Sequence, residues 1–172
     1  MARRTSLREF QESLAQRLAE SREGERRTLL GLETPGENWL VDLADTGEVL
    51  PVPLIASVPM THPWYRGLVN VRGNLCGVVD FSLFQAGEPI TPAGSARILL
   101  AGALHGSGIA LLFARTSGLH GPDEFGEEDD ADEQRPWVSQ VLSDVQGRKW
   151  LKLDIGALVR NPAFLEAGVL EA

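Results

Sequence analysis

The first part of the chain has the hydrophobic pattern of a helix that runs from residue 6 to about residue 23. Ser6 and Glu9 match a capping box at its start, and Gly24 is a plausible stop. The large apolar residues recur at helical spacing and form one narrow stripe. They are Leu7, Phe10, Leu14 and Leu18. Such a stripe can pack on its own domain, on a partner helix, or weakly on a membrane surface. We predict packing on its own domain.

From residue 28 onward the pattern changes to short apolar runs separated by turn residues, which predicts β-strands. The predicted hairpins join 28–33 with 38–43, 67–72 with 75–81, 97–104 with 109–113, and 137–142 with 149–153. Gly73-Asn74 is the expected turn of the second hairpin. Four prolines within 51–63 predict an extended or loop path there. Roughly eight short strands indicate a closed or nearly closed antiparallel β architecture.

The chain returns to helical signals near its C-terminus. Asp154 is placed to cap a short helix over 155–160, and Asn161 with Pro162 frames a last short helix. The predicted organisation is an N-terminal amphipathic helix over 1–27, a β domain over 28–160, and a short helix with a tail over 161–172.

Charge is concentrated in one segment. The formal net charge is −8, and residues 123–133 hold eight acids and no base. Without this segment the chain has 16 acidic and 16 basic residues and is therefore neutral. It lacks the excess of basic residues that binds phosphate backbones or anionic lipid. This argues against the alternative of a nucleic-acid-binding small β-barrel, which needs a basic face with aromatics. We predict that 123–133 is a solvated, mobile loop that folding does not require; a docking site for a basic partner surface is the second interpretation.

The sequence offers no candidate for catalysis, a cofactor, a metal or a small-molecule substrate. Cys76 is the only cysteine and lies in an apolar run, where a buried, inert thiol is expected. His62, His105 and His120 are far apart and have no ligand spacing. Ser107 lies between glycines but lacks the spacing of a nucleophile elbow. With no signal region and no run of about 18 apolar residues, we expect a cytoplasmic protein without membrane insertion.

Two charged residues next to predicted strands form a candidate site. Arg72 ends an apolar run directly before Gly73, and such an arginine requires a carboxylate, for which Glu48 is the candidate. The pair could be an internal contact that fixes strand order, or an exposed polar site in an apolar binding groove. Both interpretations can hold together.

Residues 67–81 read Gly-Leu-Val-Asn-Val-Arg-Gly-Asn-Leu-Cys-Gly-Val-Val-Asp-Phe and resemble the CheW-like coupling domain of bacterial chemosensory systems. That family has a Gly-x-x-Asn-x-Arg-Gly run followed by an apolar strand that ends in Asp-Leu, where this chain has Asp80-Phe81. Glu48-Val49 resembles the Glu-Val/Ile pair of the family, and 150–155 resembles its final strand. The resemblance covers roughly residues 28–160.

The resemblance implies a mainly β fold of two SH3-like, five-stranded barrel subdomains around a shared apolar groove, without catalysis. It also implies an adaptor between the cytoplasmic domain of a chemoreceptor and a CheA-type histidine kinase, located in the cytoplasm and recruited to membrane-associated receptor arrays.

Carried over to this sequence, the family motif gives a set of expected protein-binding residues. They are Glu48, Val49, Leu50, Leu68, Asn70, Val71 and Arg72, with Gly67 and Gly73 as structural residues. The apolar members would supply contact area, while Glu48 and Arg72 would set geometry. The N-terminal helix, with Gln11 and Arg17 near its stripe, is similar to that of pilus-associated (PilI-type) members, which implies control of type IV pilus twitching motility. A flagellar chemotaxis coupling protein is the alternative.

Overall fold

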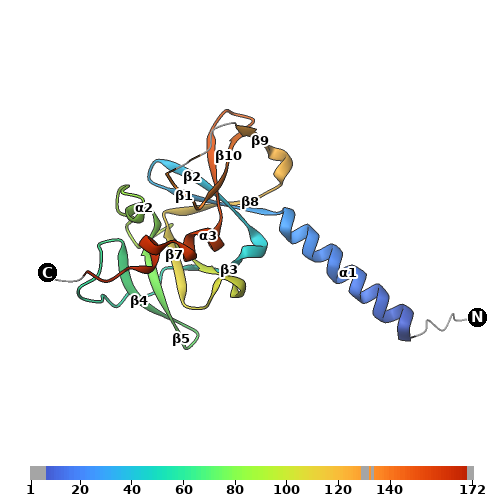
Figure 1. Ribbon diagram of the computed structural model, residues 1–172, viewed down its shortest axis with the longest axis horizontal. Helices are drawn as coiled ribbons and strands as arrows, with labels where there is room; N and C mark the ends of the chain where they lie inside the picture. Colours follow the sequence, from blue (N-terminus) through green and yellow to red (C-terminus); the bar gives the residue numbers. More distant parts are fainter. Residues whose placement is uncertain (1–6, 129–131, 133, 170–172) are drawn as a thin grey trace, which may run out of the picture.

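The computed structural model describes residues 7–128, 132 and 134–169 of the chain, and within them two β-sheets form the body of the protein (Figure 1). The first sheet has the strand order β8-β1-β2-β11-β10-β9. Its strands are β1 (Leu29–Thr34), β2 (Glu37–Asp42), β8 (Arg115–His120), β9 (Phe125–Glu128), β10 (Val138–Asp144) and β11 (Lys149–Leu153). This sheet therefore combines an early and a late segment of the chain.

The second sheet is built from one continuous segment and has the order β3-β6-β7-β5-β4. Its strands are β3 (Thr46–Pro51), β4 (Tyr65–Val71), β5 (Asn74–Asp80), β6 (Arg97–Ala101) and β7 (Ile109–Phe113). The four predicted hairpins are all present as antiparallel pairs. The predicted fold class, mainly β with two SH3-like subdomains, is confirmed, although the first sheet has six strands in the described residues rather than five.

The expected antiparallel architecture was wrong for two strand pairs. Each sheet contains one parallel pair, β2 with β11 in the first and β5 with β7 in the second. The parallel pairs arise because the chain leaves a sheet and later returns to it in the same direction. A β2 strand at residues 37–42 cannot reach β11 through a short hairpin turn, since the whole second sheet lies between them in the sequence.

The central strands bury both of their faces. We call the subdomain of the first sheet the first barrel and that of the second sheet the second barrel. On β2, Trp39 and Val41 belong to a core that both sheets share, whereas Leu40 between them points into the first barrel. On β7, Leu111 and Phe113 join the same shared core, and the alternating residues face the interior of the second barrel. Double-sided burial explains why these strands read as continuous apolar runs without alternation. It also makes the region between the two sheets a packed core.

The two short C-terminal helices close one side of this core. Asp154 caps α3 (Ile155–Arg160) by accepting a hydrogen bond from the Ala157 amide, and Asn161 caps α4 (Pro162–Leu165) in the same way from Ala163, as predicted. Phe164 of α4 is buried against an aromatic cluster that includes Trp64 and Phe84. The C-terminal segment then pairs with the proline-rich linker through an isolated bridge.

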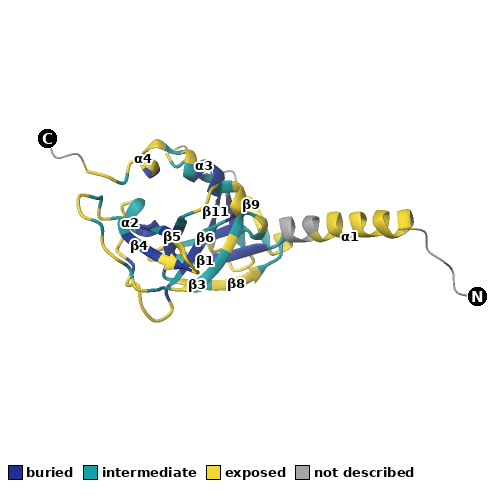
Figure 2. Cartoon of the chain, turned by 90° about the horizontal axis from the view of Figure 1, so that it is seen from below, coloured by how far each residue is buried: buried dark blue, intermediate teal, exposed yellow. Residues whose placement is uncertain are grey.

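Helix α1 (Leu7–Arg27) projects away from the body, so the prediction that it packs on its own domain was wrong (Figures 1 and 2). The four apolar residues of its stripe are between 43 and 74% exposed. Hydrophobic periodicity identifies the apolar face of a helix but does not identify the surface that covers it. None of the helices in the described residues has the length and apolar character needed to cross a bilayer.

The acidic segment is more ordered than the sequence predicts. Residues 125–128 form β9, which pairs with β10, and half-buried Phe125 packs against the core of the first barrel. Asp132 makes an ion pair of 2.6 Å with Arg135. Strand formation was not predicted because carboxylates dominate this segment, yet an exposed edge strand tolerates charged side chains. Residues 129–131 and 133 of the predicted loop lie outside the described residues.

Replacing residues 123–133 with a Gly/Ser linker is therefore expected to lower the melting temperature by several degrees, because it removes Phe125 from its core and β9 from the sheet. As a matched control, Asp123→Asn, Glu127→Gln and Glu128→Gln together keep the backbone and remove charge; they should leave the melting temperature nearly unchanged. Differential scanning calorimetry distinguishes these results. An unchanged melting temperature with the linker would show that β9 contributes nothing to stability.

The shared core should make the two barrels unfold together. Phe81 is fully buried and contacts Trp39 of the other sheet edge-on at 4.8 Å. We expect Phe81→Ala to lower the free energy of unfolding by about 3–5 kcal/mol while urea unfolding remains a single transition. Leu75→Ala, at an exposed position, should change it by less than about 1 kcal/mol. Two separate transitions in the parent protein would refute this coupling.

Candidate functional site

The hairpin of β4 and β5 carries most of the predicted binding residues. Its two-residue loop is Arg72-Gly73, because Val71 pairs with Asn74. The expected loop, Gly73-Asn74, was wrong by one residue. Both loop residues have positive φ, 52° for Arg72 and 87° for Gly73, as a type I′ turn requires. The Asn70 side chain accepts a hydrogen bond of 2.8 Å from the Gly73 amide and so fixes the loop.

An exposed ion pair joins the tip of this hairpin to the opposite edge of the sheet. Arg72 Nη2 lies 2.6 Å from Glu48 Oε1, and the side chains are 75 and 36% exposed. β3, which carries Glu48, and β4 are the two edge strands of the second sheet. The predicted pair is thus present and spans the gap between the edges. Its exposure places its contribution to stability among surface ion pairs, about 0.2–1 kcal/mol.

Backbone hydrogen bonds close the second barrel beside this pair. Leu68 of β4 exchanges two bonds of 2.8 Å with Ala56, which follows β3. Gly67 is buried here with φ +129°, and a Cβ at this position would lie 2.1 Å from the Ala56 carbonyl oxygen. Only glycine therefore allows the two edges to approach. This close approach gives a physical reason for the structural role expected of Gly67.

Strand alternation divides the predicted apolar residues between the interior and the surface. Val71 is buried in the core of the second barrel at 8% exposure, so its side chain supplies no area to a partner. Val49 and Leu50 are partly buried against the shared core and the second core, respectively. Leu68 alternates with buried Val69 and lies on the outer face of the hairpin, where it is partly exposed.

The outer face of the hairpin also presents a residue that sequence reasoning missed. Leu75 is 66% exposed and stands opposite Asn70 on the neighbouring strand. Because Leu75 belongs to an apolar run, the sequence did not show that its side chain points outward. The strand period of two, with buried Cys76 as the next residue, was the feature that could have indicated it. We define the hairpin face as Leu68, Asn70, Arg72 and Leu75, with Glu48 as the partner of Arg72.

The base of the hairpin is organised by a buried carboxylate. Asp80 is fully buried, makes an ion pair of 3.1 Å with Arg66, and accepts hydrogen bonds from the amides of Leu83 and Ile90. It thereby ends β5, caps helix α2 (Phe81–Phe84) and anchors the following loop. Tyr65 lies nearby against Gly77, and burial raises the pKa of its hydroxyl group. These contacts hold the hairpin face in place.

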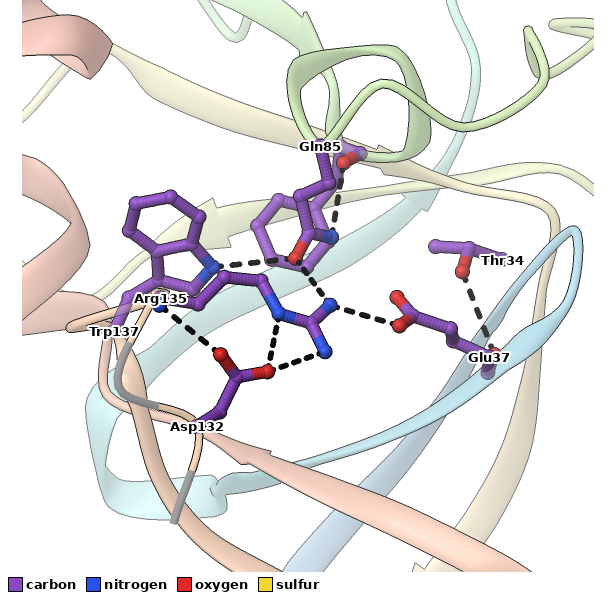
Figure 3. Close-up of polar contacts among 7 residues, drawn as sticks. Thr34, Glu37, Gln85, Asp132, Arg135 and Trp137 are labelled. Carbon is purple, nitrogen blue, oxygen red and sulfur yellow. Dashed lines mark hydrogen bonds and ion pairs between the residues drawn. The ribbon is translucent and has the colours of Figure 1, made fainter.

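A second polar cluster joins the two barrels (Figure 3). Arg135 makes ion pairs with Asp132 at 2.6 Å and Glu37 at 2.7 Å, and donates a hydrogen bond of 3.1 Å to Gln85. Trp137 donates to the same Gln85 oxygen. Burial opposes the charge of Arg135, but the hydrogen bonds to both carboxylates outweigh it and raise its pKa. Gln85 belongs to the second subdomain and the other residues to the first, so the hydrogen bonds of this cluster hold the two subdomains together.

Each of the three histidines contacts a different neighbouring side chain. His105 bonds to Asp45 at 3.1 Å, and His62 stacks on Trp64. His120 ends β8 and bonds to Glu124 at 2.9 Å. This bond, with one from the Gly121 amide, lowers the pKa of Glu124. Among the residues that the structure places, no group of three or more His, Cys, Asp or Glu is arranged to hold a metal ion.

Comparisons with known proteins agree with the motif in residues 67–81. A model of the CheW-like domain family matches residues 28–163. Protein PilI of Pseudomonas aeruginosa is 27% identical over 144 residues, which are 81% of this chain and 79% of that protein. The crystal structure of the scaffolding protein TtCheW from Thermoanaerobacter tengcongensis matches with a TM-score of 0.63 at 14% identity, covering 75% of this chain and 89% of that one. The last comparison shows a shared fold.

The strained backbone of Arg72 leads to a stability prediction. Arg72→Gly should raise the free energy of unfolding by about 1 kcal/mol, because glycine avoids a left-handed penalty of about 1–2 kcal/mol and loses only an exposed ion pair. Arg72→Ala keeps the penalty and should lower stability by less than about 1 kcal/mol. Glu48→Gln isolates the loss of the pair. Urea denaturation measures all three, and a loss of several kcal/mol in Arg72→Ala would mean that the pair is a structural requirement.

Proposed function

Because the chain belongs to the CheW-like domain family, we propose that it is a non-enzymatic adaptor that couples the cytoplasmic domain of a chemoreceptor to a CheA-type histidine kinase. The pathway we propose is the control of type IV pilus twitching motility, and the place of action is a receptor array at the cytoplasmic side of the membrane. The likeness to Protein PilI supports the pilus pathway over the flagellar one.

The observation that carries the proposal is the conformation of Arg72. A non-glycine residue with φ of 52° at a hairpin tip costs stability that glycine would save, and the surface ion pair with Glu48 offsets only part of this cost. Strain of this kind persists at sites where the side chain itself is needed. Arg72 is 75% exposed, so its guanidinium is available to another molecule.

The surroundings of Arg72 are suited to protein binding. Leu68 and Leu75 provide apolar area on the same face, and Glu48 holds the guanidinium in one orientation through a single oxygen. An arginine has five N–H donors, so most remain for carboxylates or carbonyls of a partner. Arginine is one of the residue types enriched in binding hot spots, and the two leucines add apolar contact area beside it.

The central test is a binding measurement with purified receptor cytoplasmic domain and purified CheA-type kinase. We expect Arg72→Ala and Leu75→Ala each to weaken binding to at least one partner by about tenfold or more, which corresponds to about 1.4 kcal/mol. Melting temperatures should stay close to that of the parent. Arg115→Ala is the matched control, because Arg115 is also exposed and makes a 2.6 Å pair with Glu33 on the other sheet.

The charge swap Glu48→Arg with Arg72→Glu distinguishes a structural from a binding role. The swapped pair can form again within the chain, so folding should be restored, while a partner that requires a cation at the hairpin tip should still bind weakly. Parent-like affinity of Arg72→Ala for both partners would rule out the hairpin face as the binding surface. Loss of twitching in cells that carry Arg72→Ala, but not Arg115→Ala, would support the pilus pathway.

A further inference from the structure

Helix α1 is an addition to the family domain and presents an apolar stripe that its own body leaves uncovered. The family match begins at residue 28, directly after the helix. All four stripe residues are exposed. By helical geometry, Arg17 borders the stripe, whereas Glu12 and Glu20 lie on the opposite half of the helix. The stripe is therefore apolar with a cationic border.

The stripe cannot reach its own domain while α1 is straight. Leu18 lies ten residues before Thr28, which is about 15 Å along the helix axis, and Leu7 lies about 31 Å away. Figure 1 shows the helix extending from the start of β1 away from both sheets. A second molecule is required to cover it.

The first barrel has an open cavity of about 340 Å³, and its lining is complementary to the apolar stripe of α1 and the arginine beside it. Leu29, Leu142 and Phe125 line it with apolar surface, and the first two are core residues. Asp42 and Glu127 bring carboxylates to the same cavity. The cavity volume lies at the small end of the range for ligand sites, which suits one or two inserted side chains.

The net charge around this cavity is opposite to that of the arginine beside the stripe. Lys152, which pairs with Asp42 at 3.1 Å, is the one cation among the residues that line the cavity, against two carboxylates. Exposed Asp123 and Glu128 lie on the same acidic segment as Glu127. Among the described side chains, Arg17 is the charge that borders the stripe, whereas residues 122–128 beside the cavity carry four acids and no base. Opposite charges on the two surfaces favour contact between copies of the chain.

We propose that α1 of one copy docks into the first-barrel cavity of a second copy, with Phe10 and Leu14 inserted against Phe125 and Leu142. Arg17 then lies towards the acidic rim around Glu127. This self-association uses neither Arg72 nor the hairpin face, so it stands independently of the proposed adaptor function. It would link adaptors to one another while the hairpin face remains available to other partners.

The decisive experiment mixes two variants of the full chain that each carry one added cysteine, Gln11→Cys beside the stripe and Gln140→Cys, under mild oxidation. Gln140 is exposed and lines the cavity, and the native Cys76 is buried, so it does not compete. We expect a disulfide-linked dimer from the mixture and far less from either variant alone. A dimer that forms best from Gln11→Cys alone would show that α1 pairs with α1, and would overturn the proposal.

Sedimentation velocity over a dilution series provides the second measurement. Leu14→Glu and Arg17→Glu should each abolish the dimer, and Glu12→Arg, on the opposite half of the helix, is the matched control that should retain it. Glu127→Arg should restore the dimer of Arg17→Glu, and raised salt should weaken the parent dimer. A monomer at all concentrations, or binding of the stripe only to anionic phosphatidylglycerol vesicles, would refute docking into a second copy.

Discussion

The hydrophobic core between the two sheets is the constraint on which the rest of this structure depends. Its side chains come from both sheets and from the C-terminal helices, and the edge-on contact of Trp39 with Phe81 joins strand β2 to the second subdomain. Burial of this size is the main favourable contribution to folding. Because each central strand has one face in this core and the other inside a barrel, neither sheet retains an apolar inner face for a partner.

The surfaces open to a partner are therefore the outer faces and the barrel ends. The hairpin face lies on the outside of β4 and β5, and its inward residues anchor it to the second core. Buried Asp80 fixes the base of the hairpin, while Asn70 fixes its tip. These contacts hold the hairpin face in one arrangement, which suits the binding role proposed for it.

The sequence predicts elements well where local signals and tertiary contacts agree. Apolar runs separated by turn residues identified the four hairpins, and cap residues identified both C-terminal helices. β8 was missed because Arg-Thr-Ser-Gly-Leu-His has no apolar run; it is a strand because β1 offers it a free edge. The partners Glu48 and Arg72 could be inferred from charge, but their exposure depends on how the barrel closes.

The side-chain directions in the hairpin, the position of its loop and the position of α1 could not be predicted from the hydrophobic pattern, and each has a physical reason. The hairpin carries apolar residues on its exposed face as well as on its buried face, so the inward direction of Val71 and the outward direction of Leu75 were hidden in the sequence. The loop was misplaced by one residue because Arg-Gly and Gly-Asn both resemble turns. The loop that forms is the one to which the Asn70 side chain is hydrogen-bonded. The position of α1 depends on what covers its stripe, which the helix itself does not encode.

The order of the strands along the chain has a consequence for synthesis on the ribosome. The second barrel is contiguous over residues 46–113 and can form as soon as that segment has emerged. The first barrel cannot, since β1 and β2 are made early but their neighbours β8 and β11 arrive only with the last third of the chain. Until then β2 has an unpaired edge and the apolar residues of the future shared core are exposed, a condition that promotes aggregation of nascent chains. The first barrel is thus completed only when residues 115–153 return to a hairpin that was translated first.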